Sequence, residues 1–134
     1  MKKRGSIIIV EDDFILAKVT QLQLARMGYE VVAIFSSGEQ TLHGIDKHPA
    51  DLILMDIQLS GKLDGIQTVE AIRKSSNIPV VYMTGNSDQS TKQRAMNTNC
   101  SAYLVKPVDK GLLEVTVTEA LEADRSHHTA SVDP

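Results

Sequence analysis

Five short apolar runs, each followed by a segment of helical character, are the feature that most restricts what this chain can fold into. The runs are rich in Val and Ile and are continuous, without the alternation of a half-exposed strand. Continuous runs of this kind are typical of strands that are covered on both faces, as in a parallel sheet. They cover residues 6–10, 31–35, 51–55, 79–83 and 101–105.

The segments between the runs carry apolar residues at helical intervals. Two of them open with possible capping boxes, in which Ser37 precedes Gln40 and Asp64 precedes Gln67 by three positions. The segment 88–97 predicts a mostly polar helix. In the first helical segment, which ends at a Gly28 stop, one shared face carries Ile15, Leu16, Val19, Leu22 and Ala25. In the last helical segment, 109–121, the aligned residues are Leu112, Leu113, Thr116, Val117, Ala120 and Leu121.

This alternation of strand and helix predicts an α/β fold, a doubly wound (βα)5 arrangement with a five-stranded parallel sheet and helices on both faces. A length of 134 residues fits one domain. We place that domain at residues 5–124. Residues 125–134 lack apolar periodicity, which predicts a frayed tail or the start of a linker.

Charge and composition argue against several partners. A net charge of −3 favours neither direct nucleic-acid binding nor an anionic membrane surface. The apolar run behind the basic N-terminus is too short for a signal peptide or a membrane span. The single cysteine, Cys100, suits a reducing compartment. We therefore expect a cytoplasmic protein without a membrane partner.

Chemically capable residues follow four of the five runs. Glu11 and Asp12 follow the first run, Asp56 the third, Thr84 the fourth and Lys106 the fifth. In open α/β sheets, ligands bind beyond the carboxyl ends of the strands at a switch point in the strand order. If the first and third strands are neighbours, with the fourth and fifth to one side, these residues meet at one edge of the sheet.

Each of these residues has an ordinary alternative role. Asp12 or Asp13 alone could cap the first helix, and Asp56 alone could be a solvated strand end. Thr84 alone could bond to backbone, and Lys106 alone could be a surface lysine. Their combination at successive strand ends favours a site.

Crowded carboxylates repel one another unless a cation lies between them. Magnesium suits such a site, because it takes one or two carboxylates and keeps water ligands that a phosphate can displace. The charge of −3 on Glu11, Asp12 and Asp56 would be balanced by Mg²⁺ and Lys106. This arrangement indicates phosphoryl transfer onto a carboxylate.

With these features in place, the sequence resembles the receiver domain of two-component response regulators, the CheY-like superfamily. The resemblance covers Ser6 to Ala123 and rests on "IIIVEDD", "LILMDIQLSGKLDGI", "PVVYMTGNSD" and "AYLVKPVD" together with the fivefold alternation. It implies a flavodoxin-like sheet with strand order 2-1-3-4-5.

The resemblance also implies roles for the acids. Asp56 would accept a phosphoryl group from a sensor histidine kinase or a phosphotransfer protein. Asp12 and Asp56 would bind Mg²⁺ directly, with Glu11 acting through water. The backbone carbonyl of Gln58 would complete the protein ligands.

At the neighbouring strand ends, Lys106 would pair with phosphoryl oxygens, and the Lys106–Pro107 bond would be cis. Thr84 would turn its hydroxyl toward the phosphoryl group. Tyr103 would then swing inward and change the face formed by 88–97, 101–105 and 109–121. That face would control an unknown output domain or partner, or form a homodimer. Without the resemblance, Tyr103 is simply a core or rim aromatic.

Two features of the loop after Asp56 depart from the family pattern. The interval from Asp56 to Asp64 is one residue longer than the commonest family spacing, and Ser60-Gly61 stand where a proline is frequent, so the path of residues 58–62 stays open. Gln58 and Asn86 each lie two residues past a site residue and flank the path of an attacking water. We expect them to tune the lifetime of the acyl phosphate, although both could equally be ordinary loop residues.

Two other functions compete with a phosphorylation switch that catalyses only its own modification. An aspartyl-phosphate phosphatase would carry a general acid two residues after its nucleophile, where this chain has Gln58. A pseudo-receiver would bind partners without phosphorylation, which the intact set of Asp12, Asp56, Thr84 and Lys106 argues against. We therefore expect a signalling protein and not an enzyme in the ordinary sense.

Overall fold

The computed structural model describes residues 3–132, and of residues 127–132 the backbone alone. It contains a five-stranded sheet in the order β2-β1-β3-β4-β5, in which every neighbouring pair is parallel. The predicted fold class and strand order are thus confirmed. The strands are β1 (Ser6–Val10), β2 (Glu30–Phe35), β3 (Leu52–Met55), β4 (Val80–Thr84) and β5 (Ala102–Val105).

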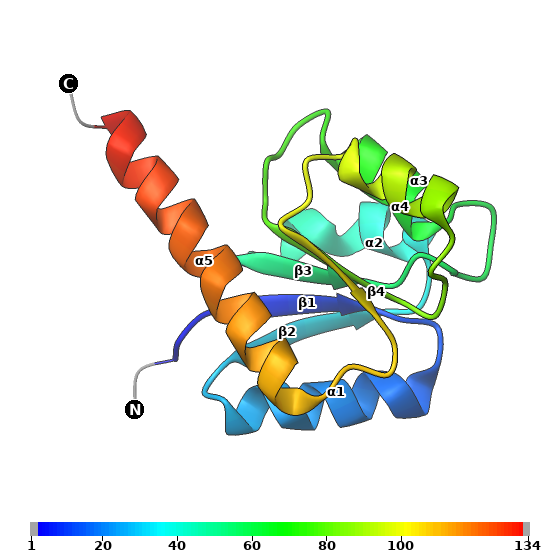
Figure 1. The fold of residues 1–134 in the computed structure, drawn as a ribbon, viewed down its shortest axis with the longest axis horizontal. Coiled ribbons are helices and arrows are strands. Elements are labelled where there is room, and N and C mark those ends of the chain that lie inside the picture. Colours follow the sequence, from blue (N-terminus) through cyan, green and yellow to red (C-terminus); the bar gives the residue numbers. More distant parts are fainter. Residues whose placement is uncertain (1–2, 133–134) are drawn as a thin grey trace.

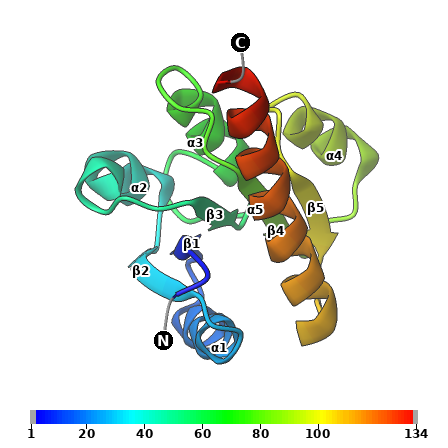
Figure 2. The same ribbon diagram turned by 90° about the vertical axis from the view of Figure 1, so that its left-hand side faces the viewer.

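Helices cover both faces of the sheet (Figures 1 and 2). One face packs against α1 and α5, and the other against α3, α4 and the short η1, with α2 beside α3. This is the double winding that alternating strands and helices predict. The helices are α1 (Phe14–Arg26), α2 (Gly38–Gly44), η1 (Ile45–Lys47), α3 (Gly65–Ile72), α4 (Gln89–Met96) and α5 (Lys110–Val132).

The two central strands, β1 and β3, are buried on both faces. Side chains alternate across a strand, so Ile7 and Ile9 enter the core beneath α1 and α5 while Ile8 and Val10 enter the opposite core. All four residues of β3 are buried. The continuous apolar runs therefore fill two cores at once, which fixes the strand ends in a rigid frame.

Short polar side chains cap four of the helices, α1, α2, α3 and α5. The carboxylate of Asp13 accepts the Leu16 N–H at 3.1 Å and caps α1. Asp64 caps α3 in a complete capping box with Gln67. Because Asp13 is the cap of α1, its neighbour Asp12 is left for another role.

The packing of α1 differs from the face that the apolar spacing suggests. Ile15, Val19 and Leu22 are exposed, and the sheet instead packs against Ala17, Thr20 and Leu24. Two of these three are short side chains, which allow the helix to approach the sheet closely. The shared apolar face of α1 therefore points to solvent.

The last helix is longer than the periodicity predicts. α5 continues to Val132 over 23 residues and projects past the strands (Figure 1), so the described part of the predicted tail is helical. Residues 125–132 contain neither Gly nor Pro, so nothing interrupts the helical hydrogen bonds. Asp133 and Pro134 lie outside the described residues. A linker role for this segment stays a prediction.

Within residues 3–132, none of the helices combines the length and the apolar character that crossing a bilayer requires.

Candidate functional site

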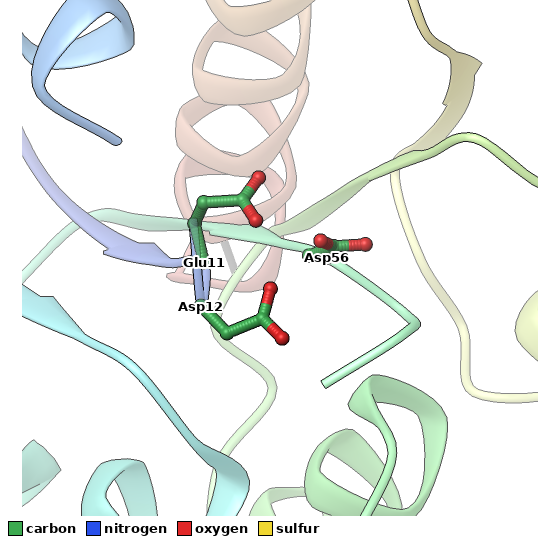
Figure 3. A group of neighbouring side chains, drawn as sticks. All are labelled: Glu11, Asp12 and Asp56. Atoms are coloured by element: carbon green, nitrogen blue, oxygen red, sulfur yellow. The ribbon is translucent and has the colours of Figure 1, made fainter. Parts of the chain in front are cut away.

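The pairing of β1 with β3 brings three acids together. Val10 lies opposite Met55, so the residues that follow them, Glu11 and Asp56, emerge side by side. The Asp56 N–H donates to the Val10 carbonyl at 2.9 Å and so continues the ladder. Figure 3 shows Glu11, Asp12 and Asp56 projecting from these strand ends, and one carboxylate oxygen of each lies within 4.8 Å of the others.

Lys106 reaches this cluster from the end of β5, two strands away from β3. Its Nζ lies 2.7 Å from Glu11 Oε1 and 3.2 Å from Asp56 Oδ2. All three side chains are largely withdrawn from water, with exposed fractions of 21% for Lys106, 8% for Glu11 and 7% for Asp56. A partly buried cation thus bridges two buried carboxylates that follow different strands.

Burial and pairing change the acid–base behaviour of this bridge. The pKa of Glu11 is raised to about 7, mainly by burial and also by the adjacent Asp56, against the opposing hydrogen bond from Lys106. Burial also disfavours the charged form of Lys106, but its bond to Glu11 and the charges of Asp56 and Glu11 outweigh that effect and raise its pKa. The lysine therefore stays protonated at neutral pH and supplies the positive charge that the carboxylates need.

Backbone groups fix the orientation of the buried acids. Gln58 N–H donates to Asp56 Oδ1 at 3.2 Å, and Asp13 N–H donates to Glu11 Oε2 at 3.1 Å. The first residue of α3, Gly65, lies so close to the Asp56 carbonyl that a Cβ there would overlap it. A glycine at this position lets α3 pack directly against the backbone that carries Asp56.

The donor set fits a hard divalent cation. Three carboxylates from Glu11, Asp12 and Asp56 offer oxygen ligands within one small region, and oxygen is the ligand that Mg²⁺ prefers. Asp12 is exposed, so this side of the cluster is open to water ligands. The residues present can therefore hold the expected Mg²⁺.

A second chain of contacts runs from Thr84 to Tyr103 beside the cluster. Thr84 is buried at the end of β4, and its hydroxyl oxygen accepts the Asn86 N–H at 3.1 Å. The Asn86 carbonyl accepts the Tyr103 hydroxyl at 2.8 Å. Asn86 Oδ1 also accepts the Asp88 N–H at 2.6 Å. The loop between β4 and α4 thus links the two residues that the resemblance assigns to the switch.

The sequence prediction is correct about which residues meet and incomplete about their neighbours. Glu11, Asp12, Asp56 and Lys106 form one group, and the Lys106–Pro107 bond is cis as expected. Gln58 directs its N–H to Asp56, which leaves the expected metal-binding role of its carbonyl a proposal.

Two side chains near the acids were missed by sequence reasoning. Ser60 donates to Asp12 at 2.9 Å, and Glu39 accepts the N–H groups of Lys62 and Leu63. The extra residue after Asp56 and the Ser60-Gly61 pair were the signals in the sequence that this loop was unusual.

This geometry defines a class of protein. It is a flavodoxin-like α/β domain with an acid cluster and a lysine at the carboxyl edge of its sheet. The family model of the response regulator receiver domain matches residues 7–118. The chain therefore belongs to the response regulator receiver family.

Curated relatives show the same relationship. The chain is 35% identical over 128 residues to the transcriptional regulatory protein ZraR of Escherichia coli, which covers 95% of this chain and 27% of that protein. It is 31% identical over 120 residues to the probable transcriptional regulator ycf27 of Cyanidium caldarium, covering 90% of this chain and 47% of that one. The chain thus spans between about a quarter and a half of these relatives.

Solved structures agree with the fold. The signal receiver domain of a modulated diguanylate cyclase from Desulfovibrio desulfuricans aligns with a TM-score of 0.86 and 32% identity, over 92% of this chain and 98% of that one. A CheY-like response regulator receiver domain protein from Methanospirillum hungatei aligns with a TM-score of 0.84 and 26% identity, over 91% and 97% of the two chains. The similarity thus extends over nearly the whole chain.

Proposed function

We propose that this receiver domain accepts a phosphoryl group on Asp56 from a sensor histidine kinase or a phosphotransfer protein. The observation that carries the proposal is the bridge of Lys106 between Glu11 and Asp56, next to the open carboxylate of Asp12. Asp56 lies at the carboxyl edge of the sheet with 7% of its side chain exposed, and Lys106 offsets part of the negative charge around it. Such a carboxylate can meet an anionic phosphoryl group.

In the transfer step, an Asp56 carboxylate oxygen attacks phosphorus and forms a P–O bond. The P–N bond of the phosphohistidine breaks, and the leaving imidazole keeps the electron pair and takes up a proton. Lys106, 3.2 Å from Asp56 Oδ2, remains beside the developing charge and pairs with a phosphoryl oxygen. Positioning and charge neutralisation are the main demands of such a step.

Asp12 and Asp56 would bind Mg²⁺ directly, together with the Gln58 carbonyl, and Glu11 would act through water. When bound, the ion neutralises charge on the phosphoryl oxygens. Asp56 and Gln58 are held in place by the Gln58 N–H contact, and Glu11 by Asp13 and Lys106.

A protein donor needs a surface beside the site, and α1 offers one. Phe14 and Ile15 directly follow the acids at the end of β1, and both are more than two-thirds exposed, at 71% and 75%. Val19 and Leu22 continue this apolar face along α1. We propose that the phosphodonor protein covers this face while its phosphohistidine reaches Asp56.

The output would be a change in the face formed by α4, β5 and α5. The contacts from Thr84 through Asn86 to Tyr103 support this role, because movement of the Thr84 hydroxyl toward a phosphoryl group would release the Asn86 N–H. Reversing a two-state equilibrium from 1:99 to 99:1 needs about 5.5 kcal/mol. One charge-assisted hydrogen bond supplies only ~1.5–3 kcal/mol, so Thr84, Lys106 and the metal would act together.

The lifetime of the acyl phosphate would depend on Gln58 and Asn86. Gln58 is exposed beside Asp56, whereas the Asn86 side chain is engaged with the Asp88 N–H. We therefore expect Gln58 to influence the dephosphorylation rate more than Asn86 does. Exchange of both residues would change the dephosphorylation rate.

The full-length relatives named above are transcriptional regulators, and we propose a comparable place for this domain ahead of an output function. The face of α4, β5 and α5 would bind the output domain or partner, or a second copy of the chain. We assign nucleic-acid contact to such a partner, because the chain itself carries a net charge of −3. Its single, free cysteine suits the cytoplasm.

Intact-mass analysis after incubation with Mg²⁺ and acetyl phosphate tests the proposal. Wild-type protein should gain the mass of one phosphoryl group, in a form labile to base, and Asp56→Asn should gain none. Asp64→Asn is the matched control, because Asp64 lies in the same stretch but caps α3, and Asn is an equally good cap. It should be modified like the wild type.

Other outcomes would identify the competing functions. Binding of Mg²⁺ without any mass gain in the wild type would contradict phosphoryl acceptance and favour a pseudo-receiver. Rapid multiple turnover of diverse phosphomonoesters would instead indicate a phosphatase.

A further inference from the structure

The longer loop after Asp56 has a fixed path in the structure. Glu39, in the first turn of α2, accepts the N–H groups of Lys62 at 3.2 Å and Leu63 at 3.3 Å. These hydrogen bonds, that of Lys62 first, lower the pKa of Glu39, so the acceptor is charged at neutral pH. Gly61 makes the required turn with a φ of 99°. The loop is therefore bound to α2.

This path brings a hydroxyl to the acid cluster. Ser60 forms an isolated parallel bridge with Ser37, just before α2, and its Oγ donates to Asp12 Oδ2 at 2.9 Å. Ser60 and Asp12 are 48 positions apart in the sequence. The contact therefore depends on the loop path and not on local sequence.

We propose that Ser60 is a positioning residue that orients the Asp12 carboxylate for Mg²⁺, with Glu39 holding the loop that carries it. The inference rests on the proposed function, because it concerns the metal ligand of that same site. It adds a residue that neither the motifs nor the family spacing assigned.

The physical reason is the exposure of Asp12. An exposed aspartate samples several rotamers, and binding an ion in one of them costs conformational entropy. Ser60 engages Oδ2 and leaves Oδ1 available, so the carboxylate is partly ordered before the ion arrives. Groups that hydrogen-bond to metal ligands from outside commonly raise metal affinity in this way.

Titration of the unphosphorylated protein with Mg²⁺ by isothermal calorimetry tests the inference. Loss of one hydrogen bond from a hydroxyl to an exposed carboxylate predicts that Ser60→Ala weakens Mg²⁺ binding about threefold to tenfold. Ser60→Thr keeps the hydroxyl and should bind within about twofold of the wild type. Ser75→Ala is the matched control, an exposed serine just after α3 and outside the site, and should leave the affinity unchanged.

The rate of phosphorylation by acetyl phosphate at varied Mg²⁺ gives a second measurement. Ser60→Ala should raise the Mg²⁺ concentration for half-maximal rate by the same factor and leave the maximal rate nearly unchanged. Glu39→Gln should shift it in the same direction, because a neutral amide holds the loop less well.

Two results would overturn the inference while the proposed function stands. One is a Ser60→Ala affinity equal to or tighter than that of the wild type. The other is a Ser60→Thr variant whose Mg²⁺ affinity falls as much as that of Ser60→Ala. Failure of the wild type to bind Mg²⁺ or to be phosphorylated would instead overturn the proposed function.

Discussion

Helices α3 and α4 have the same length of 8 residues and cover the same face of the sheet, but α3 contributes far more to the core. A single residue of α4, Ala95, is buried. The buried residues of α3 are Gly65, Ile66, Thr68, Val69 and Ile72. Apolar burial therefore holds α3 in place and contributes little to holding α4.

The N-terminal end of α3 is also held more firmly than that of α4. Asp64 and Gln67 form a reciprocal capping box on α3. The corresponding residue of α4, Asp88, directs its carboxylate to the hydroxyls of Ser90 and Thr91 and makes no side-chain cap bond to the backbone. The start of α4, next to Asn86 and Tyr103, is thus the less constrained end.

The C-terminal end of α4 is fastened by a buried polar network. The Tyr82 hydroxyl lies 2.8 Å from Thr98 Oγ1, which also donates to the Ala95 carbonyl at 2.6 Å. Arg73, just after α3, donates to the carbonyls of Thr98 and Asn99. A helix fastened at one end and lightly packed elsewhere can shift at low cost. The comparison indicates that α3 holds the site in place, whereas α4 is suited to move when the site changes.

The largest test of this contrast is truncation of one apolar side chain in each helix. Ile66→Ala in α3 should lower the free energy of unfolding by about 2–5 kcal/mol, because it leaves a cavity in the core. Met96→Ala in α4, where the side chain is 50% exposed, should cost less than about 0.5 kcal/mol. Urea denaturation measures both. Comparable losses would show that α4 is as well integrated as α3.

A smaller effect is expected at the fastening of α4. Tyr82→Phe should lower the free energy of unfolding by about 0.5–1.5 kcal/mol and speed amide hydrogen exchange at residues 95–99, with α3 unchanged. Tyr29→Phe is the matched control, because the Tyr29 hydroxyl bonds Thr118 at 2.8 Å on the opposite face. If both variants speed exchange equally in α4, the network does not fasten that helix.

The smallest effect belongs to the ion pair between the two helices. Arg94 Nη2 lies 3.2 Å from Asp64 Oδ2, with the side chains 49% and 30% exposed. Arg94→Ala should therefore cost less than about 0.5 kcal/mol, and salt should reduce that further. Asp64→Ala should cost about 1 kcal/mol, because it also removes the cap of α3. A larger loss of unfolding free energy for Arg94→Ala than for Asp64→Ala would contradict this prediction, because the ion pair would then outweigh the helix cap.

The sequence was sufficient for the strands and for the principal acids. Continuous apolar runs identify doubly covered strands, and polar residues that follow them identify the edge where Glu11, Asp12 and Asp56 meet. The same reasoning did not predict which face of α1 packs on the sheet. Apolar residues lie on two sides of that helix, and close approach favoured Ala17 and Thr20 over the larger Ile15.

By itself, then, the sequence determined the order of elements, the acids and the lysine that follow the strands, and the helix caps at Ser37 and Asp64, because these depend on local pattern and on the geometry of parallel strands. Only the tertiary structure decided the bridge of Lys106 to Glu11, the contact of Ser60 with Asp12 and the Tyr82–Thr98 bond. Each joins side chains that are distant in sequence, and loop path and packing set such distances. No local pattern encodes them.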